Sequence, residues 1–181
     1  MHAYSSIDLR VSPLVNDSVL SILSRYCRGI RVLTFAKSNA KVSDKALAAL
    51  LGACKTSLEV LDLANCSLQD PSVGAIVSHC SNLTSLTLWS KISPLAFNQL
   101  KFLKNITKFT LVGCKSVEER PFIAMCKQWS KQLTHLDVSS SPNLTNRCAL
   151  LLAITVSCED CSPLLPAAST PSHNTCNNCS R

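Results

Sequence analysis

The stretch from Leu58 to Leu88 decides the fold, and it reads LEVLDLANCSLQDPSVGAIVSHCSNLTSLTL. Leucines near its start are two residues apart, which is the period of a strand. Apolar residues then recur at steps of three and four, as in a short helix. The leucine spacing begins again at Leu83, 25 residues after Leu58. Neither a lone strand nor a lone short helix can bury its apolar side, so the pattern predicts copies stacked side by side into a solenoid.

Six copies of this pattern follow one another at steps of 26, 28, 25, 23 and 27 residues. Their first positions are Tyr4, Ile30, Leu58, Leu83, Ile106 and Leu133. Their inner apolar pairs are Ile7 and Leu9, Leu33 and Phe35, Leu61 and Leu63, Leu86 and Leu88, Phe109 and Leu111, and Leu136 and Val138. We expect a side chain just ahead of each helical stripe to accept hydrogen bonds from the first helical turn. The candidates are Asp17, Asp44, Asp70 and Asn146. Helices are predicted to end near Cys27, Cys54, Cys80 and Cys126.

The L-x-x-L-x-L spacing, with cysteine at the turn in Cys66 and Cys114, resembles the cysteine-containing leucine-rich-repeat family. This subclass is found in F-box/leucine-rich-repeat proteins and in a shorter relative that antagonises mitotic exit in yeast. The resemblance covers roughly residues 4 to 158. It implies an α/β leucine-rich-repeat solenoid of about six repeats, with parallel strands on the concave face and helices on the convex face. Pro94 occupies the helix start of the fourth repeat, where we expect a short or displaced helix.

Residues 1–158 are predicted to form the repeat domain, and residues 159–181 a polar, disordered tail. The first repeat starts almost at Met1, so we expect an incompletely capped solenoid with no room upstream for an F-box.

Four cysteines near the C-terminus have the spacing C-x-x-C, 14 residues, C-x-x-C, which is close to a zinc pattern. They are Cys158, Cys161, Cys176 and Cys179. Cys158 also closes the last predicted helix, and the residues between the pairs lack strand or hairpin character. We therefore interpret this segment as an irregular terminus without metal, and a zinc site is the alternative.

The composition favours a globular array, with 46% hydrophobic and 16% charged residues. There is neither a signal peptide nor an apolar run long enough to span a bilayer, so a cytoplasmic location is expected, with the nucleus as the alternative.

Most of the 11 cysteines are explained as reduced core thiols by their repeat positions. The net charge of +7 is concentrated between Lys91 and Lys131. We interpret these basic residues as solvated surface; an acidic partner, nucleic acid or anionic lipid is the alternative, and the lack of interleaved aromatics disfavours nucleic acid.

Side chains that flank the inner apolar pairs must point away from the core, because neighbours on a strand alternate between faces. They define three rows across the predicted sheet. The first row is Ser6, Val32, Val60, Ser85, Lys108 and His135. The second row is Asp8, Thr34, Asp62, Thr87, Thr110 and Asp137, and the third is Arg10, Ala36, Ala64, Trp89, Val112 and Ser139. Our candidate binding residues are Trp89, Asp62, Lys108, His135, Asp137 and Thr87. Trp89 could anchor a partner or fold over its own edge, and His135 could meet an acidic group or be a plain surface histidine.

No catalytic motif emerges, since the four glycines form no phosphate loop and neither H-E-x-x-H nor G-x-S-x-G occurs. The sequence therefore predicts a non-catalytic binding module without a cofactor, whose partner is a protein on the concave face. The family resemblance implies the substrate-recognition part of an F-box ubiquitin-ligase adaptor, with contact to the ligase scaffold direct or bridged. A free-standing scaffold or inhibitor is the second hypothesis. A zinc-dependent or nucleic-acid-associated module, which would use the tail cysteines and the basic residues, is the third.

Overall fold

The structure is a computed structural model, and it describes residues 5–10, 12, 14–35, 42–90, 92–113, 115, 117–139, 141 and 143–144. The sixth helical stripe, with Asn146, and the tail with its four cysteines lie outside these residues. The predicted division at residue 158 lies outside them as well.

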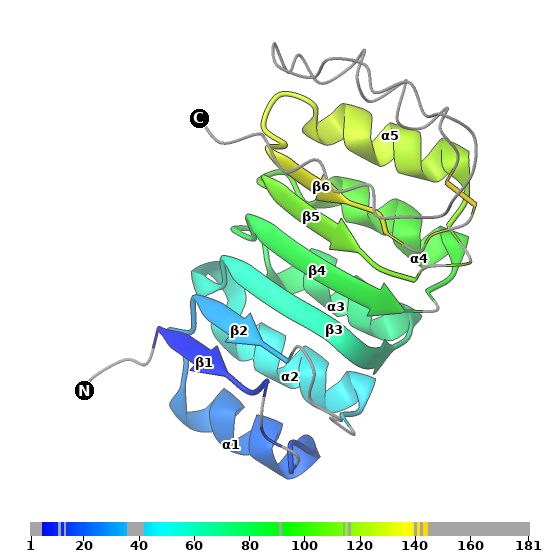
Figure 1. The fold of residues 1–181 in the computed structure, drawn as a ribbon. Coiled ribbons are helices and arrows are strands. Elements are labelled where there is room, and N and C mark those ends of the chain that lie inside the picture. The colour runs from blue at the N-terminus through cyan, green and yellow to red at the C-terminus, as the bar shows by residue number, and fades with distance from the viewer. Residues whose placement is uncertain are drawn as a thin grey trace.

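Six parallel strands form one sheet in the order in which they occur along the chain (Figure 1). They are β1 (Ser6–Asp8), β2 (Val32–Thr34), β3 (Val60–Leu68), β4 (Ser85–Ser90), β5 (Lys108–Leu111) and β6 (His135–Asp137). The register aligns one apolar residue from every strand: Ile7, Leu33, Leu61, Leu86, Phe109 and Leu136. The predicted parallel α/β arrangement and the pairing of the repeated positions are therefore confirmed.

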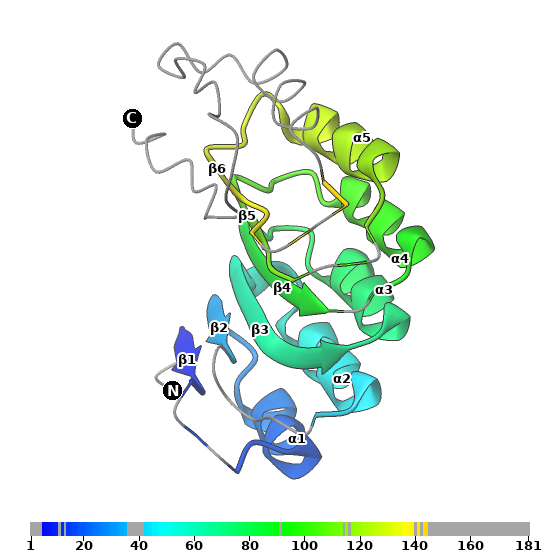
Figure 2. The same ribbon diagram turned by 45° about the vertical axis from the view of Figure 1, so that its right-hand side comes forward.

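A helix follows each of the first five strands and returns the chain to the next one. These helices are α1 (Asp17–Tyr26), α2 (Asp44–Cys54), α3 (Asp70–His79), α4 (Pro94–Gln99) and α5 (Glu119–Trp129). Short 3₁₀ turns follow two of them, η1 (Lys55–Ser57) and η2 (Leu100–Phe102). Figure 2 shows the strands along the inner side of a shallow curve and the helices along its outer side. The helix that begins at Pro94 is the shortest of the described helices, as expected for a proline tolerated only in the first turn.

The core lies between the sheet and the helices. Four of the aligned strand residues, Leu33, Leu61, Leu86 and Phe109, have no exposed surface. Trp129 is also fully buried, and its ring meets the edge of Phe109 at 5.2 Å between centroids. Trp129 therefore packs in the core. The expected helix end at Cys126 is wrong, because α5 continues to Trp129 and the indole takes the place at the end of the helix.

The described cysteines are free thiols at repeat positions, as predicted. Cys27 and Cys80 cap the C-terminal ends of α1 and α3, and Cys54 ends α2. Burial raises the pKa of the thiols of Cys54 and Cys66 to about 11, and that of Cys80 to about 12. These three side chains therefore stay protonated at neutral pH and fill space in the core.

The predicted capping aspartates lie one residue inside their helices, so their expected role is wrong. The N-cap residues of α1, α2 and α4 are Asn16, Ser43 and Ser93, whose side chains accept hydrogen bonds from the first turn. Asp17 instead accepts from the backbone N–H and the hydroxyl of Ser43, at 2.8 and 2.7 Å. Asp70 accepts in the same way from the backbone N–H of Ser93 at 2.9 Å. Each aspartate thus ties its helix to the residue that starts the next helix.

Asp44 makes the equivalent contact between α2 and α3. It accepts from the backbone N–H of Gln69 at 3.4 Å and from the hydroxyl of Ser72. Three successive helix junctions are therefore joined by one kind of bond, from a carboxylate in one unit to donors in the next.

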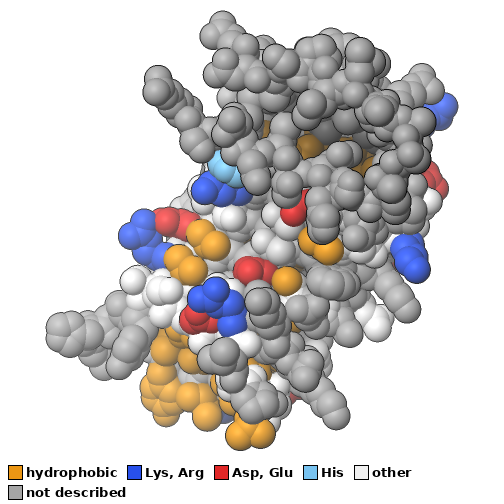
Figure 3. Space-filling view, viewed as in Figure 1, with side chains coloured by type: hydrophobic (Ala, Val, Ile, Leu, Met, Phe, Trp, Pro, Cys, Tyr) orange, Lys and Arg blue, Asp and Glu red, His pale blue; other side chains and the backbone are white. Residues whose placement is uncertain are grey.

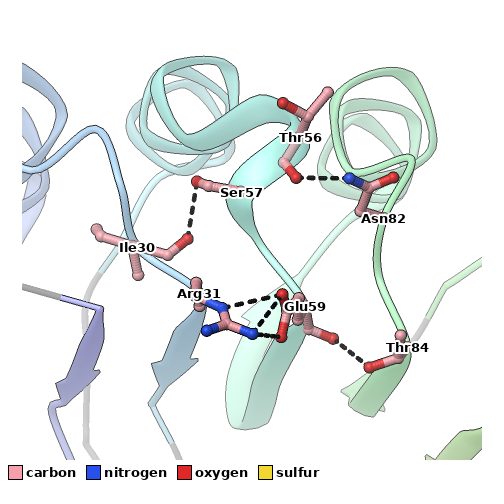
Figure 4. A network of polar contacts seen from close by, with 7 residues as sticks. All are labelled: Ile30, Arg31, Thr56, Ser57, Glu59, Asn82 and Thr84. Carbon is pink, nitrogen blue, oxygen red and sulfur yellow. Dashed lines mark hydrogen bonds and ion pairs between the residues drawn. The ribbon is translucent and has the colours of Figure 1, made fainter.

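Polar side chains also join successive units at the other end of the strands, just before each strand begins (Figure 4). The Ser57 hydroxyl donates to the carbonyl of Ile30 at 2.9 Å, and Asn82 Nδ2 donates to the carbonyl of Thr56 at 2.8 Å. The hydroxyl of Thr84 donates to the carbonyl of Glu59 at 3.0 Å. Because a buried or half-buried carbonyl without a donor is costly, the bonds from Ser57 and Asn82 satisfy carbonyls to which the strands supply no N–H. The hydroxyl of Thr84 adds a third donor to the carbonyl of Glu59, which already accepts from the N–H groups of Thr84 and Ser85.

Candidate functional site

The exposed face of the sheet carries two continuous rows of side chains, and both agree with the predicted first and second rows. The register pairs every member of each row with its neighbour on the next strand. Adjacent strands lie about 4.8 Å apart, so each row is a line of closely spaced side chains across all six units. Most of these residues between β2 and β6 are half-buried, and Lys108 is exposed. The surface is therefore accessible and shaped by the backbone of the sheet.

Carboxylates in the second row are held by the backbone two residues further on. Asp62 Oδ1 accepts from the N–H of Ala64 at 3.0 Å, and Asp137 Oδ1 accepts from the N–H of Ser139 at 2.9 Å. This local turn orients each carboxylate and uses one of its two oxygens. The candidate residue Asp62 therefore holds the backbone inside β3, and Asp137 holds the backbone that follows the last residue of β6. They stand in the same row but three strands apart, too far to act as a pair.

Two ion pairs neutralise other charges on or beside this face. Asp8 and Arg10 contact one another within β1 and the turn after it, with Arg10 Nε 2.8 Å from Oδ2 of Asp8. This contact lowers the pKa of the Asp8 carboxyl. Arg31 and Glu59 form a two-bond pair, with both N–O distances at 2.9 Å (Figure 4). The hydrogen bonds and charge of Glu59 raise the pKa of Arg31.

The Arg31–Glu59 pair was missed in the sequence. Both residues stand one position before their strands, at equivalent points of the second and third units. Opposite charges at equivalent positions of successive repeats are the signal that could have revealed the pair, because parallel strands place such positions side by side.

Lys108 and His135 are neighbours in the first row, paired across β5 and β6. Lys108 is exposed, and His135 is half-buried with Nδ1 3.2 Å from the hydroxyl of Thr134. Figure 3 shows a basic and a histidine side chain together over the starts of these two strands. Thr87 lies in the second row on β4, near the middle of the sheet and half-buried.

The third row does not continue across the sheet in the way that we expected. The β3–β4 pairing shifts after Leu63 and Leu88, and resumes only where Leu68 pairs with Ser90. The β4–β5 pairing ends at Leu88 and Leu111. Trp89 belongs to β4 by its backbone, and its side chain lies outside the described part of the structure. Its predicted role as an anchor stays a prediction.

The basic residues between Lys91 and Lys131 are spread over different sides, as their positions predict. Lys108 is on the sheet, Lys127 is on α5, and Lys104 and Lys131 follow helical turns. Lys101 Nζ lies 5.4 Å from the ring centre of Phe102. These side chains form no single basic patch with Lys108.

Within the described ranges, no group of three or more His, Cys, Asp or Glu side chains is placed to hold a metal ion. The four cysteines with zinc-like spacing lie outside those ranges, so the zinc hypothesis stays untested. No helix in the described ranges is long and apolar enough to cross a membrane.

Comparisons with known proteins show the fold and no family. No protein-family profile matches the chain, and no curated protein matches it by sequence. The fold matches a chain in the crystal structure of the yeast Rad7 and Elc1 complex, with a TM-score of 0.71 and 19% sequence identity. The match covers 82% of the present chain and 37% of the other one. The present chain thus spans little more than a third of the protein that it resembles.

Proposed function

We propose that this chain is a non-catalytic, leucine-rich-repeat protein-interaction module that binds a protein target on the exposed face of its sheet. One observation carries the proposal: six strands in continuous register present two unbroken rows of side chains on an accessible, inward-curved face. A surface of this kind is the usual binding site of a repeat solenoid. The regular leucine positions and the free cysteines at helix ends support the cysteine-containing repeat type.

We further propose that the module is the substrate-recognition part, or a relative, of an F-box ubiquitin-ligase adaptor. The support is the family resemblance of the repeats, together with a fold match to a chain crystallised as part of a two-protein complex. The free thiols fit a reducing compartment, so a cytoplasmic or nuclear location belongs to the same proposal.

The binding face is tested by changing one side chain in its middle. Thr87→Arg places a long cation among the rows on β4, and should remove bound partners while leaving the fold intact. Ala49→Arg is the matched control, because Ala49 is exposed on α2, on the helical side. Affinity capture from cells with quantitative mass spectrometry should show proteins that bind the wild type and Ala49→Arg but not Thr87→Arg. Identical partner sets for all three proteins would rule out the sheet face as the binding surface.

The same capture separates the adaptor from a free-standing scaffold or regulator. Recovery of a ubiquitin-ligase scaffold, directly or through a bridging chain, is expected for the adaptor. Partners that depend on Thr87 without any ligase subunit would favour the free-standing scaffold and count against the ubiquitin link.

A further inference from the structure

Some charged side chains on or beside the sheet face form ion pairs, and Lys108 belongs to none of these pairs. In the described part of the chain, the ion pairs are Asp8 with Arg10 and Arg31 with Glu59. Both pairs belong to the first three units of the sheet. Lys108 belongs to neither pair, and it projects from the fifth strand into solvent. The nearby acid of the same face is Asp137, one of whose oxygens is occupied by the N–H of Ser139.

Two adjacent apolar side chains lie in the same row as Lys108. Val32 and Val60 are adjacent in the register, and both are half-exposed at the starts of β2 and β3. Figure 3 shows hydrophobic side chains gathered on this part of the sheet, beside the charged ones. Ser85 separates the two valines from Lys108. Along the first row the surface therefore changes from apolar, through a hydroxyl, to cationic.

The spacing of these features fits one kind of ligand conformation. Val60 and Lys108 are two strands apart, which corresponds to about 9.6 Å at about 4.8 Å per strand. A polyproline II segment rises about 3.1 Å per residue and has three residues per turn. Side chains three residues apart in such a segment point the same way and are about 9.3 Å apart. A peptide running across the strands can therefore place one side chain on Val60 and another beside Lys108.

We propose that the first row binds an extended acidic peptide, with an apolar side chain over Val60 and a carboxylate three residues away at Lys108. This inference rests on the proposed function of the sheet face. It adds the chemical class of the partner: a protein segment in polyproline II conformation with an apolar and an acidic residue at positions i and i+3, in one of the two orders. Lys108 supplies the positive charge that pairs with this carboxylate.

Fluorescence anisotropy with short labelled peptides tests the proposal. The probes are GPPLPPEPPG and its reversed order GPPEPPLPPG. Control peptides replace Glu with Gln, or place Leu and Glu next to one another. One of the two probe orders should bind the full chain, and the control peptides should bind at least about threefold more weakly, as is usual for an exposed ion pair.

A charge swap then assigns the site. Lys108→Glu should weaken binding of the Glu peptide by about fivefold, and a peptide with Lys in place of Glu should recover affinity for this variant. Lys131→Glu, which makes the same charge change after α5, should leave binding unchanged. The proposal is overturned if neither probe binds, if both lysine variants act alike, or if a 12-nucleotide RNA binds through Lys108 in place of the peptides. If the acidic-peptide proposal fails in one of these ways but cellular partners are still lost in Thr87→Arg, the proposed function stands and only the acidic-peptide inference is wrong.

Discussion

At the scale of single residues, Trp129 occupies the place at the end of the helical segment that cysteine or leucine occupies in other units. Its indole lies at the end of α5, fully buried, and Nε1 donates to the carbonyl of Leu103 at 2.6 Å. Leu103 itself follows η2 at the end of the fourth unit. One side chain therefore fills the core and satisfies a carbonyl of the preceding unit, whereas the smaller thiol of Cys54 reaches the carbonyl of Cys27 only at 4.0 Å.

Trp129→Phe separates these two contributions. The variant keeps an aromatic ring against Phe109 and loses the donor to Leu103, so we expect it to lower the free energy of unfolding by roughly 1–3 kcal/mol. Trp129→Ala also removes the packing and should cost about 3–5 kcal/mol. Urea unfolding followed by circular dichroism measures both. Gln128→Ala, an exposed neighbour on α5, is the control. Equal losses for Phe and Ala would mean that the hydrogen bond, and not the ring volume, dominates.

At the scale of elements, carboxylates hold each helix to the start of the next. The hydrogen bonds from Ser43 to Asp17, and from Ser93 to Asp70, lower the pKa of both carboxyls below the ordinary value of 3.8. A carboxyl with a lowered pKa binds fewer protons in the folded chain than in the unfolded chain. Its contribution to stability is therefore fully present above about pH 5 and is lost as the pH falls through the folded pKa.

Asp70→Asn should remove part of this acid sensitivity. The amide keeps an oxygen that can accept from the N–H of Ser93, but it has no charge to lose. We expect the variant to be somewhat less stable than the wild type at pH 7, and its urea midpoint to fall less between pH 5 and pH 2.5. Asp17→Asn should behave alike, because Ser43 supplies the same kind of donors. Unfolding curves whose midpoints fall in parallel with the wild type would contradict the role of these carboxylates.

Equivalent positions on different helices show which side of a helix packs on the preceding one. A Cβ added to Gly52 on α2 would lie 3.7 Å from the ring of His79 on α3. Ala75, four residues before His79, is buried on the same helix. Ile22 and Tyr26 occupy the corresponding places on α1, and they are 57% and 80% exposed. Ile22 and Tyr26 therefore lie on the side of α1 that corresponds to the side of α3 packed against α2.

Substitutions at corresponding positions should differ sharply in cost. Ala75→Lys forces a charged chain between packed helices, and should destabilise the protein by roughly 2–4 kcal/mol. Ile22→Lys changes an exposed side chain, and should stay within about 0.5 kcal/mol of the wild type. Thermal and urea unfolding of the two variants provide the comparison. A large loss for Ile22→Lys would show that this side of α1 is covered in solution.

At the scale of the whole molecule, the sheet could be predicted because its signal is local and repeated six times. Alternation places Leu61 and Leu86 in the core, and equal spacing from the inner leucines predicts which residues pair. The same rule failed beyond Leu63, because the next paired residues are Leu68 on β3 and Ser90 on β4. More residues of β3 than of β4 therefore lie between these two pairs. An irregularity of this kind depends on how two neighbouring units fit, and one unit's pattern does not contain it.

The helix junctions were harder to predict for a related reason. Asn16 and Asp17 are adjacent, and either side chain is a good cap by its chemistry. The choice is made by a contact to Ser43 in the next unit, which no property of the first helix reveals. Among the candidate binding residues, sequence placed the strand positions correctly, while the bonds that hold Asp62 and Asp137 depend on the local backbone conformation two residues further on.

The outer strands of the described sheet should open more readily than the inner ones, because each inner strand pairs with a strand on both sides. Ile7 on β1 and Leu136 on β6 are only half-buried, whereas Leu33, Leu61 and Leu86 are fully buried. In a solenoid, stability is close to a sum of unit and nearest-neighbour contributions, so a strand whose apolar residue is less buried is stabilised less by its neighbours. Native-state hydrogen exchange followed by mass spectrometry should show faster exchange in peptides that cover β1 and β6 than in those covering β3 and β4. Leu86→Ala should raise exchange on both sides of β4, whereas Ile7→Ala should affect β1 and its neighbour alone. Equal protection of all strands, with equal response to both variants, would mean that the sheet opens as one cooperative unit and that nearest-neighbour stacking does not set its stability.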